Sequence, residues 1–518
     1  MITKSHVQSY LQCPRRLWLE INDPGDVLAK DAHAMRRAND GEMVGAKARE
    51  AVGPDAIWPA SHENKATACK LALEQLAANP TTSGVEVPLT AGDFYARTDA
   101  LIPAFHGHYI LQETKASSFP LKDDKVTPGK PESHLLDDIA IQAWALMEAG
   151  LQMERAELNL LDNQWRYPGN DDYTGLFKQL DVTEQVFERR SNVKDWVDGA
   201  RATISLKEMP PAQTGSRCKK PHDCPFAKRC GDLEPKGEEH PVTLLPDVGG
   251  KALAKKLAAR GMVSLVETPE DVLVGCDEGK TLLYQRIRRA HKSSEPILDI
   301  AAREVIDALP YPRFFFDFEG IDLAIPIWKG VRPFEQMPFQ WSCHIQRAEN
   351  AEFEHAEFLD LTGDDPSLPC IEAMRTVFGE GAGGPILVYF ATYEKGRLQE
   401  LGQRHPQHRL MLEAWIARLV DLLPIVKTHY YHPIMRGSFS IKKVLKAMAP
   451  ELDYSDLDEV QDGVGAQLAY IEAALQPDTT PERKQEIAGR LKVYCGRDTW
   501  AMVVVAYHLA RRTCPVMP

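Results

Sequence analysis

The chain has 518 residues, of which 44% are hydrophobic and 26% charged, a composition typical of a globular protein with more than one core. Its net charge of -13 argues against nonspecific coating of nucleic acid or of an anionic membrane, so any nucleic-acid contact must come from local basic patches. The opening residues lack the apolar region of a signal peptide, and no run of about 18 apolar residues occurs. We therefore expect a cytoplasmic protein without a membrane partner.

The first part of the chain predicts helices followed by strands. The segment SYLQCPRRLWLE predicts one short helix, and NDGEMVGAKAREAV predicts a second, whose glycines permit close packing. Strand patterns then start at Val85, Phe94 and His108, and the first two are typical of a hairpin with the third beside it. The stretch HLLDDIAIQAWALMEAG predicts a further helix after the strands.

These strands and this helix carry residues suited to metal chemistry. Asp99 lies in the second strand, and Glu113 and Lys115 lie two residues apart in the third, so both leave the same face of the sheet. Two carboxylates on one face can hold a divalent cation, and a lysine beside them can orient water or stabilise developing negative charge. Gln142 falls in the apolar stripe of the helix, where a polar amide needs a buried partner. A Glu-x-Lys triplet alone is more often a solvated ion pair, so the hypothesis depends on the order of all these residues.

A cysteine cluster follows. The stretch CKKPHDCPFAKRC places Cys218, Cys224 and Cys230 at equal intervals, and Cys13 is the natural fourth ligand. Because thiols stay reduced in the cytoplasm, this cluster indicates a metal site and not a disulfide framework. Ligand identity alone does not separate zinc from an iron–sulfur cluster, and either would join distant segments of the N-terminal unit.

The middle of the chain predicts short helices with basic residues. The polar stretch GDLEPKGEEHP indicates a linker, and LLPDVGGKALAKKLAARGMVSLVE predicts two short helices with a weak helix-hairpin-helix signal. The later stretch YQRIRRAHKS is strongly basic. Such a run is either a solvated helix face or a phosphate-contacting surface, and the sequence leaves both open.

The last part of the chain carries a second acidic set. An apolar strand in YPRFFFDFEG delivers Asp317 and Glu319 to one face, and MPFQWSCHIQ predicts an antiparallel neighbour. The stretch ILVYFATYEKGRLQEL predicts a strand that turns into a helix near Glu394. A final amphipathic helix, AGRLKVYCGRDTWAMVVVAYHLA, has Tyr494 and Asp498 one turn apart on its apolar face.

The N-terminal order of Asp, Glu-x-Lys and a Gln-bearing helix, with one cysteine before and three after, resembles the RecB-like iron–sulfur branch of the PD-(D/E)XK nucleases, which includes exonucleases associated with CRISPR adaptation. The resemblance implies an α/β, restriction-endonuclease-like domain over residues 1–232. It implies Mg²⁺ or Mn²⁺ on Asp99 and Glu113, Lys115 as the catalytic lysine, and Gln142 in the family's helix motif. It also implies a [4Fe–4S] cluster on four cysteines, namely Cys13, Cys218, Cys224 and Cys230.

The C-terminal order of Asp-x-Glu, a helix-start Glu and Tyr-x3-Asp resembles the DEDD exonucleases of the ribonuclease-H-like fold, in the subgroup with tyrosine in the last motif. The resemblance implies such a domain over residues 313–518, with Tyr494 orienting the attacking water. It implies two divalent metals held by four carboxylates, those of Asp317, Glu319, Glu394 and Asp498. With residues 233–312 as a helical linker region, the whole chain resembles an uncharacterised bacterial family that fuses the two nuclease types.

The expected function is that of a two-site, metal-dependent nuclease acting on nucleic-acid ends, with DNA favoured over RNA and 3′ to 5′ polarity at the C-terminal site. Departures from the family patterns are Leu146 in place of a tyrosine, Glu394 in place of an aspartate, and the lack of a histidine in NDGEMVGAKARE, a ligand that Glu86 or Glu50 would have to replace. They keep two alternatives open. One is a nucleic-acid-binding or assembly protein with one or both nuclease sites decayed, and the other is an RNA-processing exonuclease.

Overall fold

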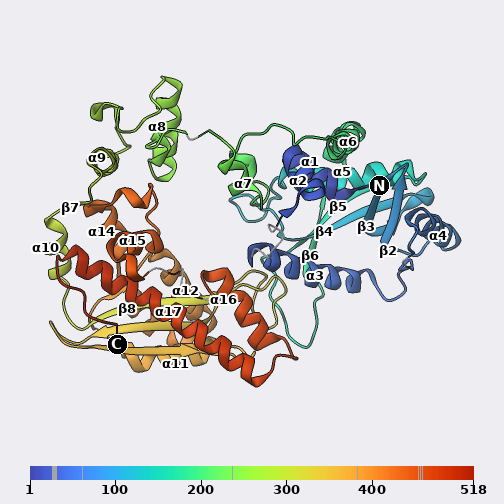
Figure 1. Cartoon of the computed structure of the whole chain (residues 1–518). Helices are drawn as coiled ribbons and strands as arrows, with labels where there is room; N and C mark the ends of the chain where they lie inside the picture. The colour runs from blue at the N-terminus through green and yellow to red at the C-terminus, as the bar shows by residue number, and fades with distance from the viewer. Residues whose placement is uncertain are drawn as a thin grey trace. The chain divides into compact units, whose positions relative to one another are not determined.

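The computed structural model is a mixed α/β protein that describes residues 1–25, 32–60, 62–235, 237–381, 383–452, 454, 457 and 459–517. It divides into two compact units (Figure 1). Unit 1 comprises Met1–Pro235 and the loop Asp322–Glu335, and unit 2 comprises Lys236–Ile321 and Gln336–Pro518. The helical region expected between the two nuclease-like parts therefore falls almost entirely within unit 2.

Unit 1 is built on a six-stranded sheet in the order β1-β3-β4-β5-β6, with β2 paired to β3 as well. The β2–β3 and β3–β4 pairs are antiparallel, which confirms the expected hairpin and its neighbour, and the β4–β5 pair is parallel. Parallel neighbours need a crossover connection, and the helix α5 supplies it. The strands are β1 (Ile2–Thr3), β2 (Gly84–Ala91), β3 (Phe94–Pro103), β4 (Tyr109–Ser118), β5 (Met153–Leu161) and β6 (Phe177–Asp181). The helices are α1 (Lys4–Gln12), α2 (Pro14–Asn22), α3 (Ala32–Val52), α4 (Lys65–Ala78), α5 (Ser133–Glu148), α6 (Thr183–Ile204) and α7 (Ala227–Asp232).

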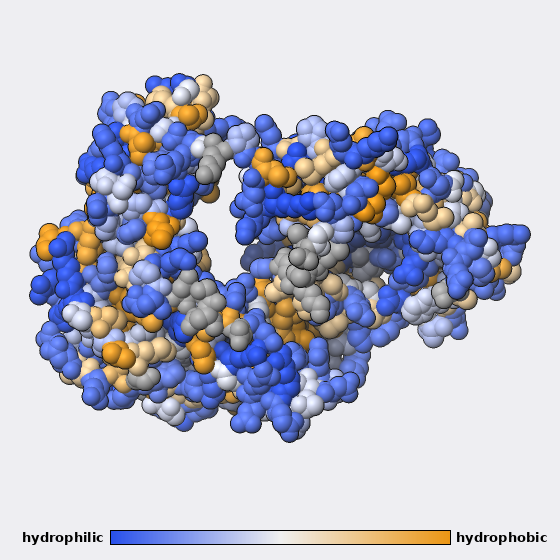
Figure 2. All heavy atoms as spheres, viewed as in Figure 1, coloured by the Kyte–Doolittle hydropathy of each residue, from blue (hydrophilic) through white to orange (hydrophobic). Residues whose placement is uncertain are grey.

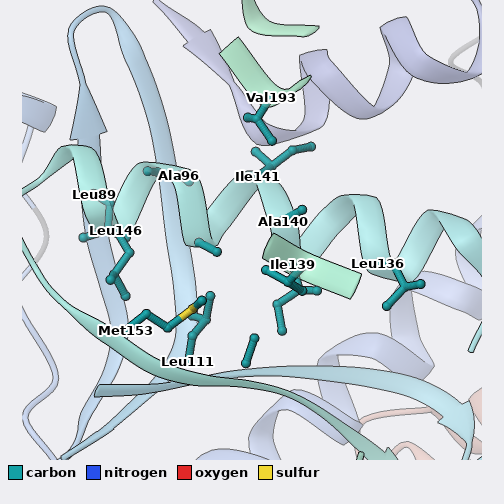
Figure 3. Close-up of a cluster of buried hydrophobic side chains, with 14 of the residues drawn as sticks. Leu89, Ala96, Leu111, Leu136, Ile139, Ala140, Ile141, Leu146, Met153 and Val193 are labelled. Atoms are coloured by element: carbon teal, nitrogen blue, oxygen red, sulfur yellow. The ribbon is translucent and has the colours of Figure 1, made fainter. Parts of the chain in front are cut away.

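The core of unit 1 lies around α5. In Figure 1, α5 and α6 lie over one face of the sheet and α3 lies across the other. Figure 3 shows Leu146 of α5 pointing towards Leu111 and Met153 of the sheet, while Ile141 points towards Val193 of α6. A helix buried on two sides is apolar nearly all round, so the polar side chains in its buried part need partners inside the protein.

The N-terminal helix differs from the expectation. The segment expected to form one helix forms two, α1 and α2, with Cys13 between them in an extended conformation (φ -166°, ψ 122°). Pro14 is the first residue of α2, where its missing N–H and fixed φ are tolerated, whereas in a continuous helix it would break a hydrogen bond. The single-helix prediction was therefore wrong at Cys13.

Unit 2 is built on a five-stranded sheet in the order β10-β9-β8-β11-β12 and a separate pair, β13-β7. The strand β8 is central, antiparallel to β9 and parallel to β11. The strands are β7 (Ile297–Leu298), β8 (Arg313–Ile321), β9 (Met337–Gln346), β10 (Phe353–Leu359), β11 (Ile386–Val388), β12 (Leu419–Asp421) and β13 (Tyr430–Tyr431). The helices are α8 (Asp247–Ala259), α9 (Glu278–Ser293), α10 (Ala301–Asp307), α11 (Ser367–Phe378), α12 (Thr392–Arg404), α13 (Arg409–Ile416), α14 (Leu422–His429), α15 (Ile441–Met448), α16 (Gly463–Tyr470) and α17 (Pro481–Leu509).

Alternation along β8 divides its side chains between two environments. Phe314, Phe316 and Phe318 join the hydrophobic core formed with α11, α12 and α13. Asp317 and Glu319 leave the opposite face, where the 29-residue helix α17 packs against β8 and β9. The period-two geometry of the strand thus places both carboxylates beneath α17.

The basic middle segment makes contacts within its own unit. Where two short helices are expected, the structure has a 3₁₀ helix at Val242–Leu244 and α8, and Ser264 beyond α8 forms an isolated bridge with Pro241. On α9, Arg286 donates to the Lys427 carbonyl, Arg288 to the Thr268 carbonyl, and Arg289 pairs with Glu270. These internal partners favour a structural role for the basic run.

The surface is mainly polar on the side shown in Figure 2, where apolar side chains form small separate patches among hydrophilic ones. Among the helices that the structure describes, none is long and apolar enough to cross a membrane.

Candidate metal centres

The strands β3 and β4 bring the predicted residues of unit 1 to one pocket. Their register pairs Ala100 with Gln112, so the next position places Asp99 beside Glu113. The backbone N–H of Thr114 donates to Asp99 Oδ2 at 2.8 Å and fixes that carboxylate. Asp99, Glu113 and Lys115 all line a pocket of about 230 Å³.

Glu113 is the centre of this site, with a side chain only 1% exposed. Its Oε2 accepts a hydrogen bond of 2.6 Å from Gln142 Nε2, and its Oε1 lies 2.6 Å from Lys115 Nζ and 3.1 Å from Lys4 Nζ. Burial, and then the charge of Asp99, raise the pKa of Glu113 to about 7. The partner required by buried Gln142 is thus the carboxylate itself.

Two further residues of this site were not predicted, Lys4 and Asp138. Asp138 pairs with Lys115 through Oδ2 and with Lys4 through Oδ1 at 3.1 Å. Burial acts to raise the pKa of Asp138, but the two ammonium groups hold it well below its ordinary value. The signal available for Asp138 was its place one turn before Gln142 on a buried helix. No sequence pattern indicated Lys4, because it belongs to α1 and comes close to Glu113 only in the folded chain.

The two acidic residues named as possible additional ligands lie in different places. Glu86 lines the pocket and lies across from Asp99, between the pairs Val85–Ala100 and Val87–Thr98 of β2 and β3. Its φ of 52° is in the left-handed region, a strained conformation that is concentrated at functional sites. Both glutamates have cationic partners, Lys47 for Glu50 and Arg49 and Arg97 for Glu86, but Glu50 is 64% exposed whereas Glu86 is 17% exposed and lines the pocket, so Glu86 is the better third carboxylate.

The four cysteines converge on a second pocket in unit 1. Cys13, Cys218, Cys224 and Cys230 all line it, and all four are free thiols of intermediate burial. The side-chain amide of Gln12 donates to the carbonyls of Arg217 and His222 at 2.8 Å each, which holds α1 against the cysteine loop. The four thiols thus share one pocket, although among the described residues only Asp317, Glu319 and Asp498 bring three ligand atoms within 4.8 Å of one another.

The acidic set of unit 2 comes from three elements, β8, α12 and α17. Asp317 and Glu319 come from β8 and Asp498 comes from α17, and ligand oxygens of the three lie within 4.8 Å of one another. Glu394 is the third residue of α12 and lies beside Asp317. Its Oε2 is buried with no hydrogen-bond partner among the described atoms. An orphaned carboxylate oxygen beside three clustered carboxylates fits a divalent cation, which prefers oxygen ligands.

The electrostatics of this cluster are those of crowded like charges. Burial raises the pKa of all four carboxyl groups, and Asp498 further raises the pKa of Asp317 and Glu319. For Glu394 the pKa rises to about 8. Like charges held together in a buried site cannot all ionise without a compensating cation.

Tyr494 lies where the sequence places it, one turn before Asp498, and is 4% exposed. A second tyrosine, Tyr454, was not predicted, and its hydroxyl donates to Asp498 Oδ1 at 2.5 Å. Lys442 Nζ lies 5.0 Å and 5.2 Å from the ring centroids of Tyr454 and Tyr494. Lys442 also lowers the pKa of Asp498 within the larger rise caused by burial, so it belongs to the edge of this site.

Asp421, at the end of β12, orients the segment that carries Glu394. Its two carboxylate oxygens accept hydrogen bonds of 3.0 Å from the backbone N–H groups of Phe390 and Ala391, just before α12. It also caps α14 by accepting from Leu423 N–H at 2.9 Å. Asp421 therefore acts on the site by fixing the start of α12.

The chain is similar to known proteins over parts of its length. A family model described as "Domain of unknown function (DUF2779)" matches residues 314–440, a range that includes Asp317, Glu319 and Glu394. The uncharacterized protein UU173 of Ureaplasma parvum serovar 3 is 24% identical over 258 residues, or 46% of this chain and 37% of that protein, so the chain spans less than half the length of this relative. A solved structure titled "Crystal structure of SSO0001" is 16% identical, with coverage of 45% of this chain and 87% of that one, but its TM-score is only 0.21.

Proposed function

We propose that this protein is a metal-dependent nuclease with two hydrolytic sites, acting on nucleic-acid ends, with DNA favoured over RNA. The observation that carries the proposal is the carboxylate cluster of unit 2, in which oxygens of Asp317, Glu319 and Asp498 lie within 4.8 Å of one another. Buried carboxylates with raised pKa values and a shared environment are typical of functional sites that await a cation.

The unit 2 site has the parts that phosphodiester hydrolysis needs. Asp317, Glu319, Glu394 and Asp498 would hold Mg²⁺ or Mn²⁺, which supplies an activated water and stabilises the leaving oxygen. Tyr494 is buried next to Asp498, where its hydroxyl would orient the attacking water. The five-stranded mixed sheet with central β8 supports a ribonuclease-H-like fold for this unit, and the order of the motifs supports degradation from the 3′ end.

The unit 1 site supports a second hydrolytic centre of the PD-(D/E)XK type. Asp99 and Glu113, with Glu86 beside them, would hold the cation, and Lys115 is held 2.6 Å from Glu113 at the pocket. The four cysteines would hold a [4Fe–4S] cluster that joins the N-terminal helices to the segment around α7.

The test is a cleavage panel with 5′- and 3′-labelled DNA and RNA in Mg²⁺ or Mn²⁺. We expect Asp317→Asn to abolish degradation from the 3′ end, and Lys115→Ala to leave it intact while removing a distinct activity. The exposed Asp364→Asn is the matched control. Cleavage that neither variant affects would favour a nucleic-acid-binding protein with decayed sites, and cleavage of RNA alone would favour an RNA-processing enzyme.

A further inference from the structure

Two lysines in the unit 1 pocket share two buried carboxylates. Lys115 Nζ and Lys4 Nζ both contact Glu113 Oε1, at 2.6 Å and 3.1 Å. The same two ammonium groups contact Asp138, each through a different oxygen. Glu113 and Asp138 have side chains only 1% and 2% exposed, whereas Lys4 and Lys115 are 22% and 24% exposed, so the lysines form the solvent side of the network.

The charge balance of this network explains a buried aspartate in an otherwise apolar stretch of α5. Removing one partner from a buried ion pair leaves an uncompensated charge, which is strongly unfavourable. The two lysines match the charges of Glu113 and Asp138, and Asp99 is a third carboxylate close enough to act on both Glu113 and Lys115. When Glu113 and Asp99 ligate a divalent cation, Asp138 remains as the counter-ion that holds both ammonium groups in place.

Lys4 is well placed to act on a substrate. It is the first residue of α1, directly after β1, and the β1–β3 pairing of Thr3 with Tyr95 anchors its backbone to the sheet that carries Asp99. Its side chain lines the same pocket as Asp99, Glu113 and Lys115. We infer that Lys4 is a second cationic group that contacts the substrate phosphate in this pocket, and that Asp138 is the positioning residue that aims both Lys4 and Lys115.

This inference rests on the proposed nuclease function of unit 1. A lysine ammonium has three donors, so Lys4 can keep its contact with Asp138 and still donate to a phosphate oxygen on which negative charge develops. Removing one such preorganised donor lowers a catalytic rate about 10²-fold to 10³-fold. Misplacing a catalytic group by about 1 Å has an effect of about 10²-fold.

The experiment uses the full chain with Asp317→Asn, so that remaining cleavage reports on unit 1. In that background we would measure single-turnover cleavage of a labelled oligonucleotide in Mg²⁺ or Mn²⁺, and its affinity in Ca²⁺, for Lys4→Met, Lys4→Arg and Asp138→Asn. The controls are Lys70→Met, whose side chain is 78% exposed, and Asp137→Asn, the neighbour of Asp138 that pairs with Arg189.

We expect Lys4→Met and Asp138→Asn each to lower the rate about 10²-fold with oligonucleotide affinity retained, because the lost contacts act mainly in the transition state. Lys4→Arg should restore most of the rate, and the controls should match the parent.

If Lys115→Ala is inactive but Lys4→Met cleaves like Lys70→Met, the inference alone fails. If both Lys4→Met and Lys115→Ala cleave normally, the inference about Lys4 and the proposed nuclease function of unit 1 both fail. Thermal melting identifies a variant that loses activity by unfolding, and a folded but inactive Lys4→Arg would contradict the expected rescue by a second cationic side chain.

Discussion

Gln142 donates a 2.6 Å hydrogen bond from its side-chain amide to Glu113 Oε2, and both side chains are buried. The bond joins α5 to β4 at the point where two of the predicted residues meet. It explains why an amide occupies an apolar helix stripe, since a buried carboxylate needs donors on each oxygen. The other oxygen of Glu113 contacts Lys115 and Lys4.

Removing this amide should destabilise unit 1. For Gln142→Leu at pH 8, above the pKa of about 7 for Glu113, we expect a loss of about 1.5–3 kcal/mol in the free energy of unfolding, typical of a hydrogen bond to a charged group. Gln75→Leu, at an exposed position of α4, should change it by less than about 0.5 kcal/mol. Denaturant unfolding monitored by fluorescence measures both, and equal effects of the two changes would contradict the role given to Gln142.

Residues whose placement depends on local periodicity could be predicted from the sequence. Alternation along β8 placed Asp317 and Glu319 on one face, and the helical repeat placed Tyr494 and Asp498 on one side of α17. The same reasoning anticipated a buried partner for Gln142. These features follow from backbone geometry within one element.

Residues that reach a site across the fold could not be predicted in this way. Lys4 contacts Glu113 across a separation of 109 residues, and Tyr454 contacts Asp498 across 44, with no short-range pattern to indicate either contact. The break at Cys13 is another example, because Pro14 is compatible with both a kinked helix and a new one. The grouping of Asp322–Glu335 with unit 1 depends on contacts such as that of Arg36 with the Asp322 carbonyl, which only the folded chain reveals.

The acidic cluster of unit 2 should cost stability until a cation binds. For Asp317→Asn we expect a larger free energy of unfolding for unit 2 than in the wild type in EDTA, by about 1–2 kcal/mol, because the variant lacks the buried, crowded carboxyl group whose pKa is raised in the folded state. Mn²⁺ at 100 times its dissociation constant for this cluster should stabilise unit 2 of the wild type by about 2.7 kcal/mol and leave unit 2 of the variant unchanged. Asp364→Asn should behave as wild type in both conditions. The assignment of Asp317 as a ligand would be wrong if Mn²⁺ stabilised both proteins equally.

Metal affinity at this cluster should rise with pH. Burial raises the pKa of each carboxyl group, that of Glu394 to about 8, so the metal-free site holds protons near neutral pH that the cation must displace. We expect the Mn²⁺ affinity to rise from pH 6 to about pH 8 as these carboxyl groups lose their protons. Titration calorimetry in buffers of different ionisation enthalpy would measure the released protons.

The stability of the metal-free protein should change with pH in the opposite sense. Carboxyl groups with raised pKa values bind more protons in the folded state than in the unfolded one, so their contribution is present below the unfolded pKa and is lost as pH rises towards about 8. Unfolding of unit 2 in EDTA at several pH values would measure this. A metal affinity independent of pH, together with a flat stability profile, would mean that the cluster is already ionised at neutral pH.

The four-cysteine centre should stabilise unit 1 and leave unit 2 unaffected. Cys13 and the three later cysteines line one pocket within unit 1, so a group bound by them ties the N-terminal helices to the segment at α7. Because metal-binding free energy becomes folding free energy, Cys224→Ser should lower the unfolding temperature of unit 1 and release the bound metal. Exposed Cys276→Ser, in unit 2, is the matched control and should retain both properties.

Anaerobic purification followed by iron, sulfide and zinc analysis identifies the group. We expect about four irons and four sulfides per chain in the wild type and in Cys276→Ser, and neither in Cys224→Ser. If the analysis finds one zinc and no iron per chain, the bound group is a structural zinc ion and not an iron–sulfur cluster. The predicted loss of stability in Cys224→Ser would still hold. Calorimetry separates the two units, since the transition assigned to unit 2 is the one whose shift by Mn²⁺ is reduced in Asp317→Asn. Loss of both transitions in Cys224→Ser would show that unit 2 depends on the cysteine centre for its folding.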